Sequence, residues 1–189
     1  MNYSCFLKAE KCCNYLIDHG YNVNDKETTG WTPIFFAIKA NAYSVVQLLI
    51  QRGARTSVID KYGMRPIHWA SKFGQIDIVR LLIENRAEID QPNSTKWTPI
   101  YLAAGYGHLP VVELLYQRGA NINVNEKGVV PIFMFAAMNG YLDVMEFLHR
   151  FGATVDIKDA VGFKFILVSV IFYLDRRSLG CIIETFRYS

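Results

Sequence analysis

Two glycines one residue apart form the first pattern in this chain that could bind a ligand. Gly105 and Gly107 stand in the stretch "KWTPIYLAAGYGH", residues 96–108. Glycine-rich loops hold phosphate groups with their backbone N–H groups when they follow a strand and lead into Lys-Ser or Lys-Thr. Neither feature accompanies this pair, so phosphate binding is not the expected role. We predict instead that the two glycines form a turn between two helices.

Cysteine spacing indicates neither a disulfide framework nor a zinc site. The chain has no C-x-x-C pair and no regular interval among Cys5, Cys12, Cys13 and Cys181. The N-terminal segment places charges in every turn and lacks the continuous apolar stretch of a signal peptide. We therefore expect a reducing intracellular setting, cytoplasmic or nuclear, and we predict no metal and no cofactor.

The composition is that of a folded globular chain with an almost neutral body. Of the 189 residues, 51% are hydrophobic and 20% are charged, and the net charge is +3. Residues 1–156 carry 15 basic against 14 acidic side chains, and residues 157–189 carry 5 against 3. Because nucleic-acid binding relies on clustered cationic charge, this balance argues against nucleic acid as the main partner.

A 33-residue period organises most of the chain. Five turn positions follow this interval, four of them glycine and one arginine: Gly20, Gly53, Arg86, Gly119 and Gly152. Small residues mark a second position with the same interval, at Ala37, Ala70, Ala103 and Ala136. A fixed period of this length is typical of repeat architectures, in which each unit packs on its neighbours.

Each unit predicts two short helices joined by a turn. Thr32 and Thr98 are expected to be N-caps whose hydroxyls can accept a backbone N–H, with proline at the first helical position. The residue pairs at 41, 74, 107 and 140 then end this helix. A second helix follows, as in "SVVQLLIQRGA" from Ser44, where apolar residues recur at helical spacing. Arg86 stands where glycine forms the left-handed cap in the other units.

These units resemble ankyrin repeats. The resemblance is carried by "GWTPIFFAIKANAYSVVQLLIQRGA" at 30–54 and "KWTPIYLAAGYGHLPVVELLYQRGANIN" at 96–123, and it covers roughly residues 9–157. It implies an all-α solenoid of helix-turn-helix units with hairpin fingers, working as a protein-binding scaffold. We expect a partial repeat with only a second helix at 1–24, four repeats at 25–157, and a degenerate capping repeat or apolar tail at 158–189.

The fifth unit departs from the pattern in two places. Compared with the other units, its linker is shorter by one residue and its "PIFMFA" segment is longer by one residue. We therefore expect a distorted finger in this unit. Val130 stands in place of the capping threonine in this unit, and Arg65 replaces it in the third. The period is regained at Gly152.

No set of side chains predicts catalysis. The four histidines fall at different places in the repeat: His19, His68, His108 and His149. The resemblance implies a structural role for His68, because histidines at its position hydrogen-bond the backbone of the finger. No Ser/His/Asp or Cys/His set shares a repeat position that would bring its members together. We therefore expect a protein that is not an enzyme.

The resemblance implies that finger tips and first helices bind a partner protein or peptide segment. Equivalent positions of successive repeats are neighbours in a solenoid, so the large apolar side chains before Thr-Pro and before the small alanine form two rows. The predicted partner-binding residues are Trp31, Phe36, Lys39, Met64, Trp69, Trp97, Leu102, Tyr106 and Phe135. Contiguous exposed apolar surface usually marks a binding site; the alternative is that these side chains pack between repeats as ordinary core.

Trp31, Phe36 and Trp69 are expected to converge between two successive repeats. Such a trio resembles the aromatic cage by which some histone-methyltransferase ankyrin domains hold methylated lysine through cation–π contacts. Lys39 stands one turn after Phe36, where that family places an acidic group, and its charge would repel a cationic guest. We therefore predict an apolar guest, Leu or Phe, and keep a methyl-lysine reader as an alternative function.

The C-terminal segment "FKFILVSVIFYL", residues 163–174, suggests another alternative, a membrane-associated protein anchored by its tail. Ten of its twelve residues are apolar, but a helix needs about 20 to span a bilayer. We predict that this segment docks on the fifth repeat as an imperfect cap and leaves apolar surface that favours self-association.

Overall fold

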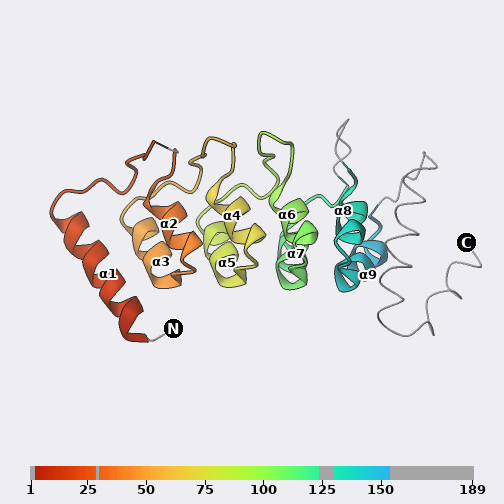
Figure 1. Cartoon of the computed structure of the whole chain (residues 1–189), viewed down its shortest axis with the longest axis horizontal. Helices are drawn as coiled ribbons and strands as arrows, with labels where there is room; N and C mark the ends of the chain where they lie inside the picture. Colours follow the sequence, from red (N-terminus) through yellow and green to blue (C-terminus); the bar gives the residue numbers. More distant parts are fainter. Residues whose placement is uncertain (1–2, 29, 124–129, 154–189) are drawn as a thin grey trace, which may run out of the picture.

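The described part of the computed structural model, residues 3–28, 30–123 and 130–153, contains nine helices and no strand. Their bounds are α1 Tyr3–Asp18, α2 Pro33–Lys39, α3 Tyr43–Gln51, α4 Pro66–Lys72, α5 Ile76–Glu84, α6 Pro99–Gly105, α7 Leu109–Gln117, α8 Ile132–Met138 and α9 Leu142–Arg150. From α2 onward, each short helix and the longer helix after it form an antiparallel pair, and the pairs stand side by side (Figure 1). The predicted all-α solenoid is confirmed.

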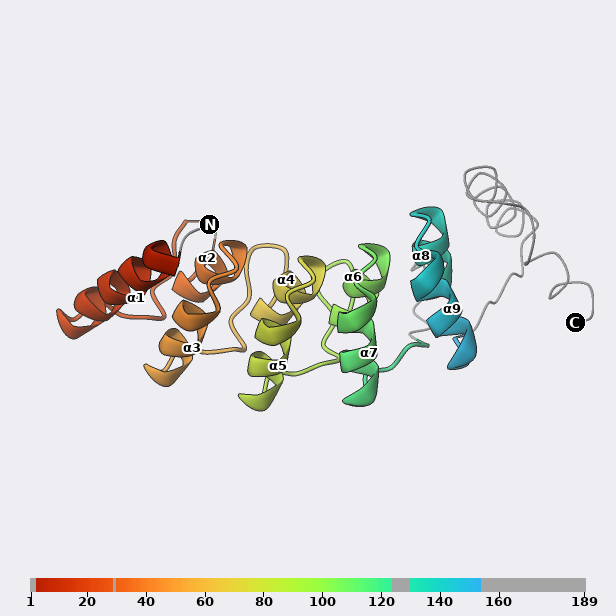
Figure 2. The same cartoon turned by 90° about the horizontal axis from the view of Figure 1, so that it is seen from below.

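The helices follow the 33-residue period without drift. The first helices of the pairs begin at residues 33, 66, 99 and 132, and the second helices begin at residues 43, 76, 109 and 142. Helices α2, α4, α6 and α8 form one row, which we call the inner row, and α3, α5, α7 and α9 form the outer row (Figure 2). Equivalent residues of neighbouring repeats therefore lie next to each other.

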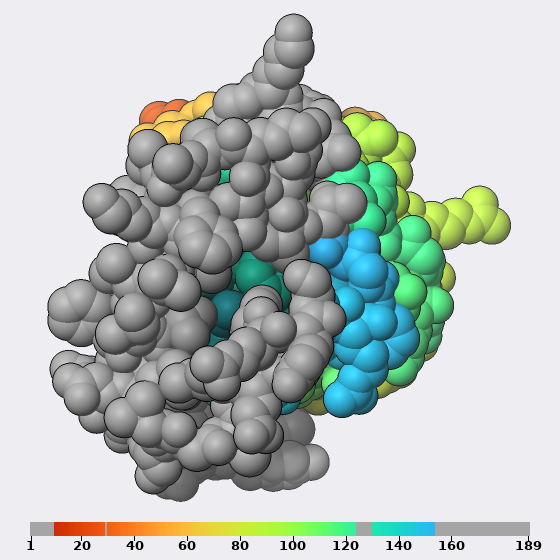
Figure 3. Space-filling view, turned by 90° about the vertical axis from the view of Figure 1, so that its right-hand side faces the viewer, coloured from red at the N-terminus to blue at the C-terminus, as the bar shows by residue number. Residues whose placement is uncertain are grey.

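Buried aliphatic side chains hold the two rows together. Ile34, Ile67 and Ile100 occupy equivalent positions in the inner row, and each has no exposed surface. Small alanines let neighbouring helices approach closely, as at Ala70 and Ala103, which are also fully buried. Helix α1 packs against α3 at one end of the stack. At the other end, the residues of α9 are seen at the surface (Figure 3).

Left-handed residues end both helices of each unit, as the period predicts. The turns between paired helices contain Asn41, Gly74, Gly107 and Gly140, with φ of 53°, 69°, 77° and 77°. After the second helices, φ is 88° at Gly53, 63° at Arg86, 90° at Gly119 and 77° at Gly152. The predicted turn role of Gly107 is therefore confirmed. Gly105 differs from the prediction, because it is the last residue of α6 rather than part of the turn.

The exposed Arg86 lies in the left-handed conformation that its place in the repeat requires. A side chain with a Cβ is disfavoured there by about 1 kcal/mol relative to glycine. Arg86→Gly should therefore raise the free energy of unfolding by about 1 kcal/mol in chemical denaturation. The reverse change at the equivalent residue, Gly119→Arg, serves as the matched control and should lower it. A loss of stability in Arg86→Gly would show that the arginine side chain makes a stronger compensating contact.

Thr32 and Thr98 are the N-cap residues of α2 and α6, as predicted, but their hydroxyls do not make the predicted capping hydrogen bonds. The hydroxyls of Thr32 and Thr98 are buried and have no hydrogen-bond partner among the described residues. In α2 the N–H of Phe35, at the third helical position, donates to the carbonyl oxygen of Thr32 at 3.0 Å instead. The N–H group that was expected to bond to the Thr32 hydroxyl thus donates to the Thr32 backbone carbonyl.

In the fifth unit the inner helix α8 keeps its place in the 33-residue period. Helix α8 is seven residues long, like the other inner helices, and Pro131 is its N-cap. The prediction that Val130 takes the capping position is therefore wrong, because Pro131 occupies it. The finger at 124–129 and the tail at 158–189, with its 163–174 segment, lie outside the described residues.

Candidate functional site

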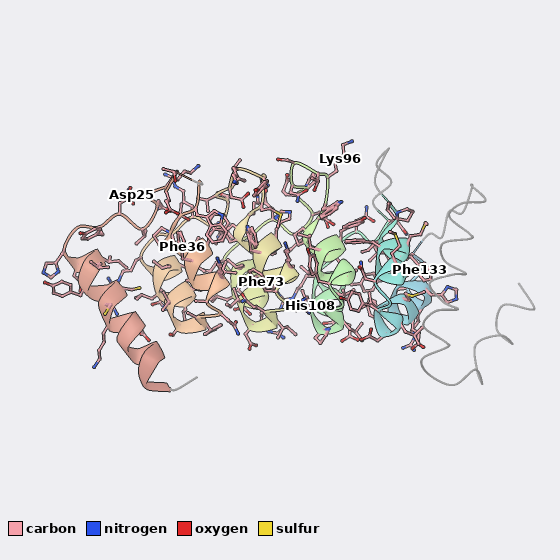
Figure 4. The ribbon with its side chains drawn as sticks, in the orientation of Figure 1. Asp25, Phe36, Phe73, Lys96, His108 and Phe133 are labelled. Atoms are coloured by element: carbon pink, nitrogen blue, oxygen red, sulfur yellow. The ribbon has the colours of Figure 1, made fainter. Side chains whose placement is uncertain are left out.

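Three aromatic rings converge on the inner row, as predicted. The Trp31 ring centroid lies 5.1 Å from that of Phe36 and 5.3 Å from that of Trp69, both in edge-to-face geometry. Phe73 adds a fourth ring, 5.5 Å from Trp69. We call these four residues the Trp31 cluster. Phe36 is 47% exposed and Phe73 is 39% exposed, and the two side chains lie beside α2 and α4 (Figure 4).

The rings of the Trp31 cluster come from different levels of the repeat. Trp31 precedes the first inner helix at the base of a finger, whereas Phe36 and Trp69 lie inside α2 and α4. The indole N–H of Trp69 donates to Oδ2 of Asp60 at 3.0 Å. Because Asp60 is only 5% exposed, this bond fixes Trp69 to the finger of its own repeat. Neither residue spacing nor the repeat period indicates this contact.

Two lysines lie on the faces of these aromatic rings. Nζ of Lys39 is 5.6 Å from the centroid of Trp31. Nζ of Lys72 is 5.1 Å from the centroids of both Trp69 and Tyr106. A cation over an aromatic face is attracted by the ring quadrupole. The predicted position of Lys39 next to the trio is therefore observed, and Lys72, one repeat further on, was missed although the period points to it.

A second group of rings lies between the fourth and fifth repeats. Phe135 stacks on Tyr101, with centroids 5.0 Å apart, and lies 5.5 Å from Trp97. Trp97 and Phe135 are half-buried, whereas Tyr101 is 4% exposed. We call these residues the Phe135 cluster. It offers less open surface than the Trp31 cluster, because its rings stack on one another.

A ring of this cluster lies against the last residue of α6 and leaves no room for a side chain there. A Cβ at Gly105 would overlap the Phe135 ring. Gly105→Ala should lower the free energy of unfolding by about 1 kcal/mol, since overpacking costs about 2 kcal/mol and the better helix propensity of alanine returns about 1.

Denaturation of Gly105→Ala, of Phe135→Leu and of the double variant tests this contact. Phe135→Leu should remove most of the penalty of the alanine. Equal penalties for the alanine in both backgrounds would show that the clash is relieved elsewhere.

Two of the predicted partner-binding residues are part of the core. Met64 is 6% exposed and Leu102 is 1% exposed, so neither presents a surface to a partner. Leu102 and Trp69 occupy equivalent positions of the repeat. The shorter leucine side chain is buried there, whereas the longer Trp69 side chain extends to the surface and is half-buried. The other seven retain exposed or half-exposed surface: Trp31, Phe36, Lys39, Trp69, Trp97, Tyr106 and Phe135.

Two histidines of the repeats, His68 and His108, make structural contacts. Nδ1 of His68 accepts the N–H of Arg65 at 3.1 Å, and the ring is fully buried. The pKa of His68 is lowered from 6.5 to about 4, mainly by burial. Among the smaller effects, the backbone of Gln91 raises this pKa, the Arg65 guanidinium lowers it, and the backbone of Trp97 and the Asp60 carboxylate raise it. Nε2 of His108 lies 2.9 Å from the carbonyl oxygen of Lys72, which joins two successive repeats.

The described residues contain no group of three or more side chains placed to hold a metal ion. Within the same ranges, every helix is too short or too polar to cross a bilayer.

The chain was compared with known protein families and with curated proteins. A family model described as ankyrin repeats (3 copies) matches residues 1–93 and 88–159. No curated protein matches the chain.

Proposed function

Because this chain belongs to the ankyrin-repeat family, we propose that it acts as a protein-interaction module that binds a partner segment on the Trp31 cluster. Ankyrin repeats are generally protein–protein interaction modules and typically not enzymes. The observation that carries the proposal is that the Trp31 ring lies 5.1 Å from Phe36 and 5.3 Å from Trp69. Phe36 is exposed, and Trp31 and Trp69 are half-buried; Trp and Phe are residue types enriched at interface hot spots.

The guest of the cluster is an apolar side chain, Leu or Phe, rather than a methylated lysine. Lys39 already lies over the face of Trp31, with Nζ 5.6 Å from the ring centroid. A second cation at the same ring would be repelled by this ammonium and would have to displace it. The open edges of Phe36 and Phe73 remain available to an apolar group.

Tryptophan fluorescence can compare the two guests on the full chain. One series of peptides carries Leu or Phe at its centre, and a matched series carries trimethyl-lysine at the same place. We expect saturable changes with the apolar series. Saturable binding confined to the trimethyl-lysine series would show that the cluster is a cage for cations.

A further inference from the structure

We propose that the segment bound at the Trp31 cluster is acidic, and that its carboxylates pair with Lys39 and Lys72. This inference rests on the proposed function and specifies the partner's chemistry. Both lysines occupy the last position of an inner helix, 33 residues apart. They flank the exposed rings that would receive the apolar side chain.

The inner row carries basic charge without acidic charge. Its four helices read PIFFAIK, PIHWASK, PIYLAAG and IFMFAAM, and their only charged residues are Lys39 and Lys72. Acidic residues appear in the outer row instead, at Asp77, Glu84, Glu113, Asp143 and Glu146. The two rows therefore present different charges, and the basic charge of the inner row lies beside the Trp31 cluster.

The fingers above the inner row do not cancel this charge. Residues 20–31, 53–64 and 86–97 together carry five basic and five acidic side chains. The carboxylate closest to the cluster, Asp60, is 5% exposed, and its oxygens accept N–H groups from Tyr62, Met64 and Trp69. The Asp60 oxygens already accept hydrogen bonds from the protein itself, so they are poorly placed to pair with the ammonium of a neighbouring lysine.

Neither lysine has an acidic partner in the described residues, where the ion pairs are Arg52–Asp18 and Arg65–Glu88. Each lies on an aromatic face, which stabilises the cation but accepts no conventional hydrogen bond. A lysine ammonium has three donors. A carboxylate can therefore bind from the solvent side while the ring contact is kept, and the ring restricts the lysine beforehand.

The spacing of the lysines defines the acidic motif. Helices of neighbouring repeats pack at about 10 Å, and an extended chain covers about 3.3–3.6 Å per residue. Two carboxylates in an extended segment would thus be about three residues apart. The partner motif is two acidic residues in this spacing with a large apolar residue between them.

Selection from a displayed library of random 12-residue peptides, with the full chain as bait, tests this motif. We expect the enriched peptides to combine Asp or Glu with Leu, Phe or Trp. Their affinity should fall about tenfold in the double variant Lys39→Met, Lys72→Met, since each exposed ion pair contributes up to about fivefold. Methionine keeps the aliphatic contact with the ring. Raising the salt concentration should reduce the affinity for wild type much more than for the double variant.

Arg80→Met with Arg118→Met is the matched control, because it removes two exposed charges associated with the outer row and should leave the affinity unchanged. Enriched peptides without acidic residues, or acidic peptides that bind the lysine double variant equally well, would overturn the inference. Tighter binding of a single-stranded oligonucleotide than of the acidic peptides would overturn it as well. Enriched peptides that bind Trp31→Ala as well as wild type would instead contradict the proposed function.

Discussion

Acidification from pH 7 to pH 4 is expected to destabilise the repeat array by about 3 kcal/mol through His68 alone. The pKa of this buried imidazole is about 4 in the folded chain, against 6.5 for an exposed histidine. The unfolded chain therefore binds the proton first as the pH falls. The stability is fully present above pH 6.5, is lost progressively toward pH 4, and changes little through this group below that.

The size of this effect follows from where the ring is held. His68 has no exposed surface, so charging it removes a cation from water, and the nearby Arg65 adds repulsion. Its Nδ1 also accepts the N–H of Arg65 at 3.1 Å, and a proton on that nitrogen would break the bond. Each unit of pKa difference corresponds to about 1.4 kcal/mol.

The comparison of wild type with His68→Gln isolates this contribution from the carboxylates that also titrate. Glutamine at the third helical position can accept the same N–H but carries no proton in this range. Urea denaturation at several pH values between 7 and 4 should show a pH dependence smaller by about 3 kcal/mol in the variant. Parallel curves for the two proteins would mean that His68 stays accessible to protons.

Truncation of either indole in the Trp31 cluster is expected to weaken partner binding by about 2 kcal/mol, or roughly 30-fold. Trp31 contacts both Phe36 and Trp69, so Trp31→Ala removes the centre of the apolar surface. Trp69→Ala removes the ring that Asp60 holds in place. The affinity of a peptide selected with the full chain can be measured by calorimetry for each variant.

The outer row supplies the matched control for these truncations. Tyr116, Phe147 and Phe151 form an aromatic group there, with centroids 4.5–5.7 Å apart. Phe151→Ala removes an exposed ring of similar kind and should leave the affinity unchanged. Circular dichroism checks that each variant keeps its helices. Equal losses from Phe151→Ala and Trp31→Ala would place the binding surface elsewhere or spread it over both rows.

The fold could be predicted from the sequence because a strict period carries three kinds of information together. Glycines and the residues that replace them predict where helices end. Alanines predict the contacts between repeats, and apolar runs predict the buried faces of the helices. Arg86 illustrates this, because its left-handed conformation, with φ of 63°, was predicted only from the glycines at equivalent positions. Its own residue type would not have indicated it.

The candidate site was less predictable, because exposure depends on side-chain length at positions that the period treats as equal. Trp69 reaches the surface, whereas Leu102 at the same repeat position is 1% exposed. The roles of Asp60 and of the Thr32 hydroxyl depend on which donor each oxygen meets. Competition between the backbone carbonyl and the hydroxyl is decided by tertiary geometry and leaves no trace in residue spacing.

The indole N–H signals in a proton–nitrogen correlation spectrum test the central claim most directly. The chain has three tryptophans, so three signals can be assigned with single Trp→Phe variants and followed during titration with a selected peptide. We predict that the signals of Trp31 and Trp69 shift along one saturable curve with the same dissociation constant as calorimetry. Full binding with both signals unmoved would contradict the claim that the Trp31 cluster is the partner-binding surface.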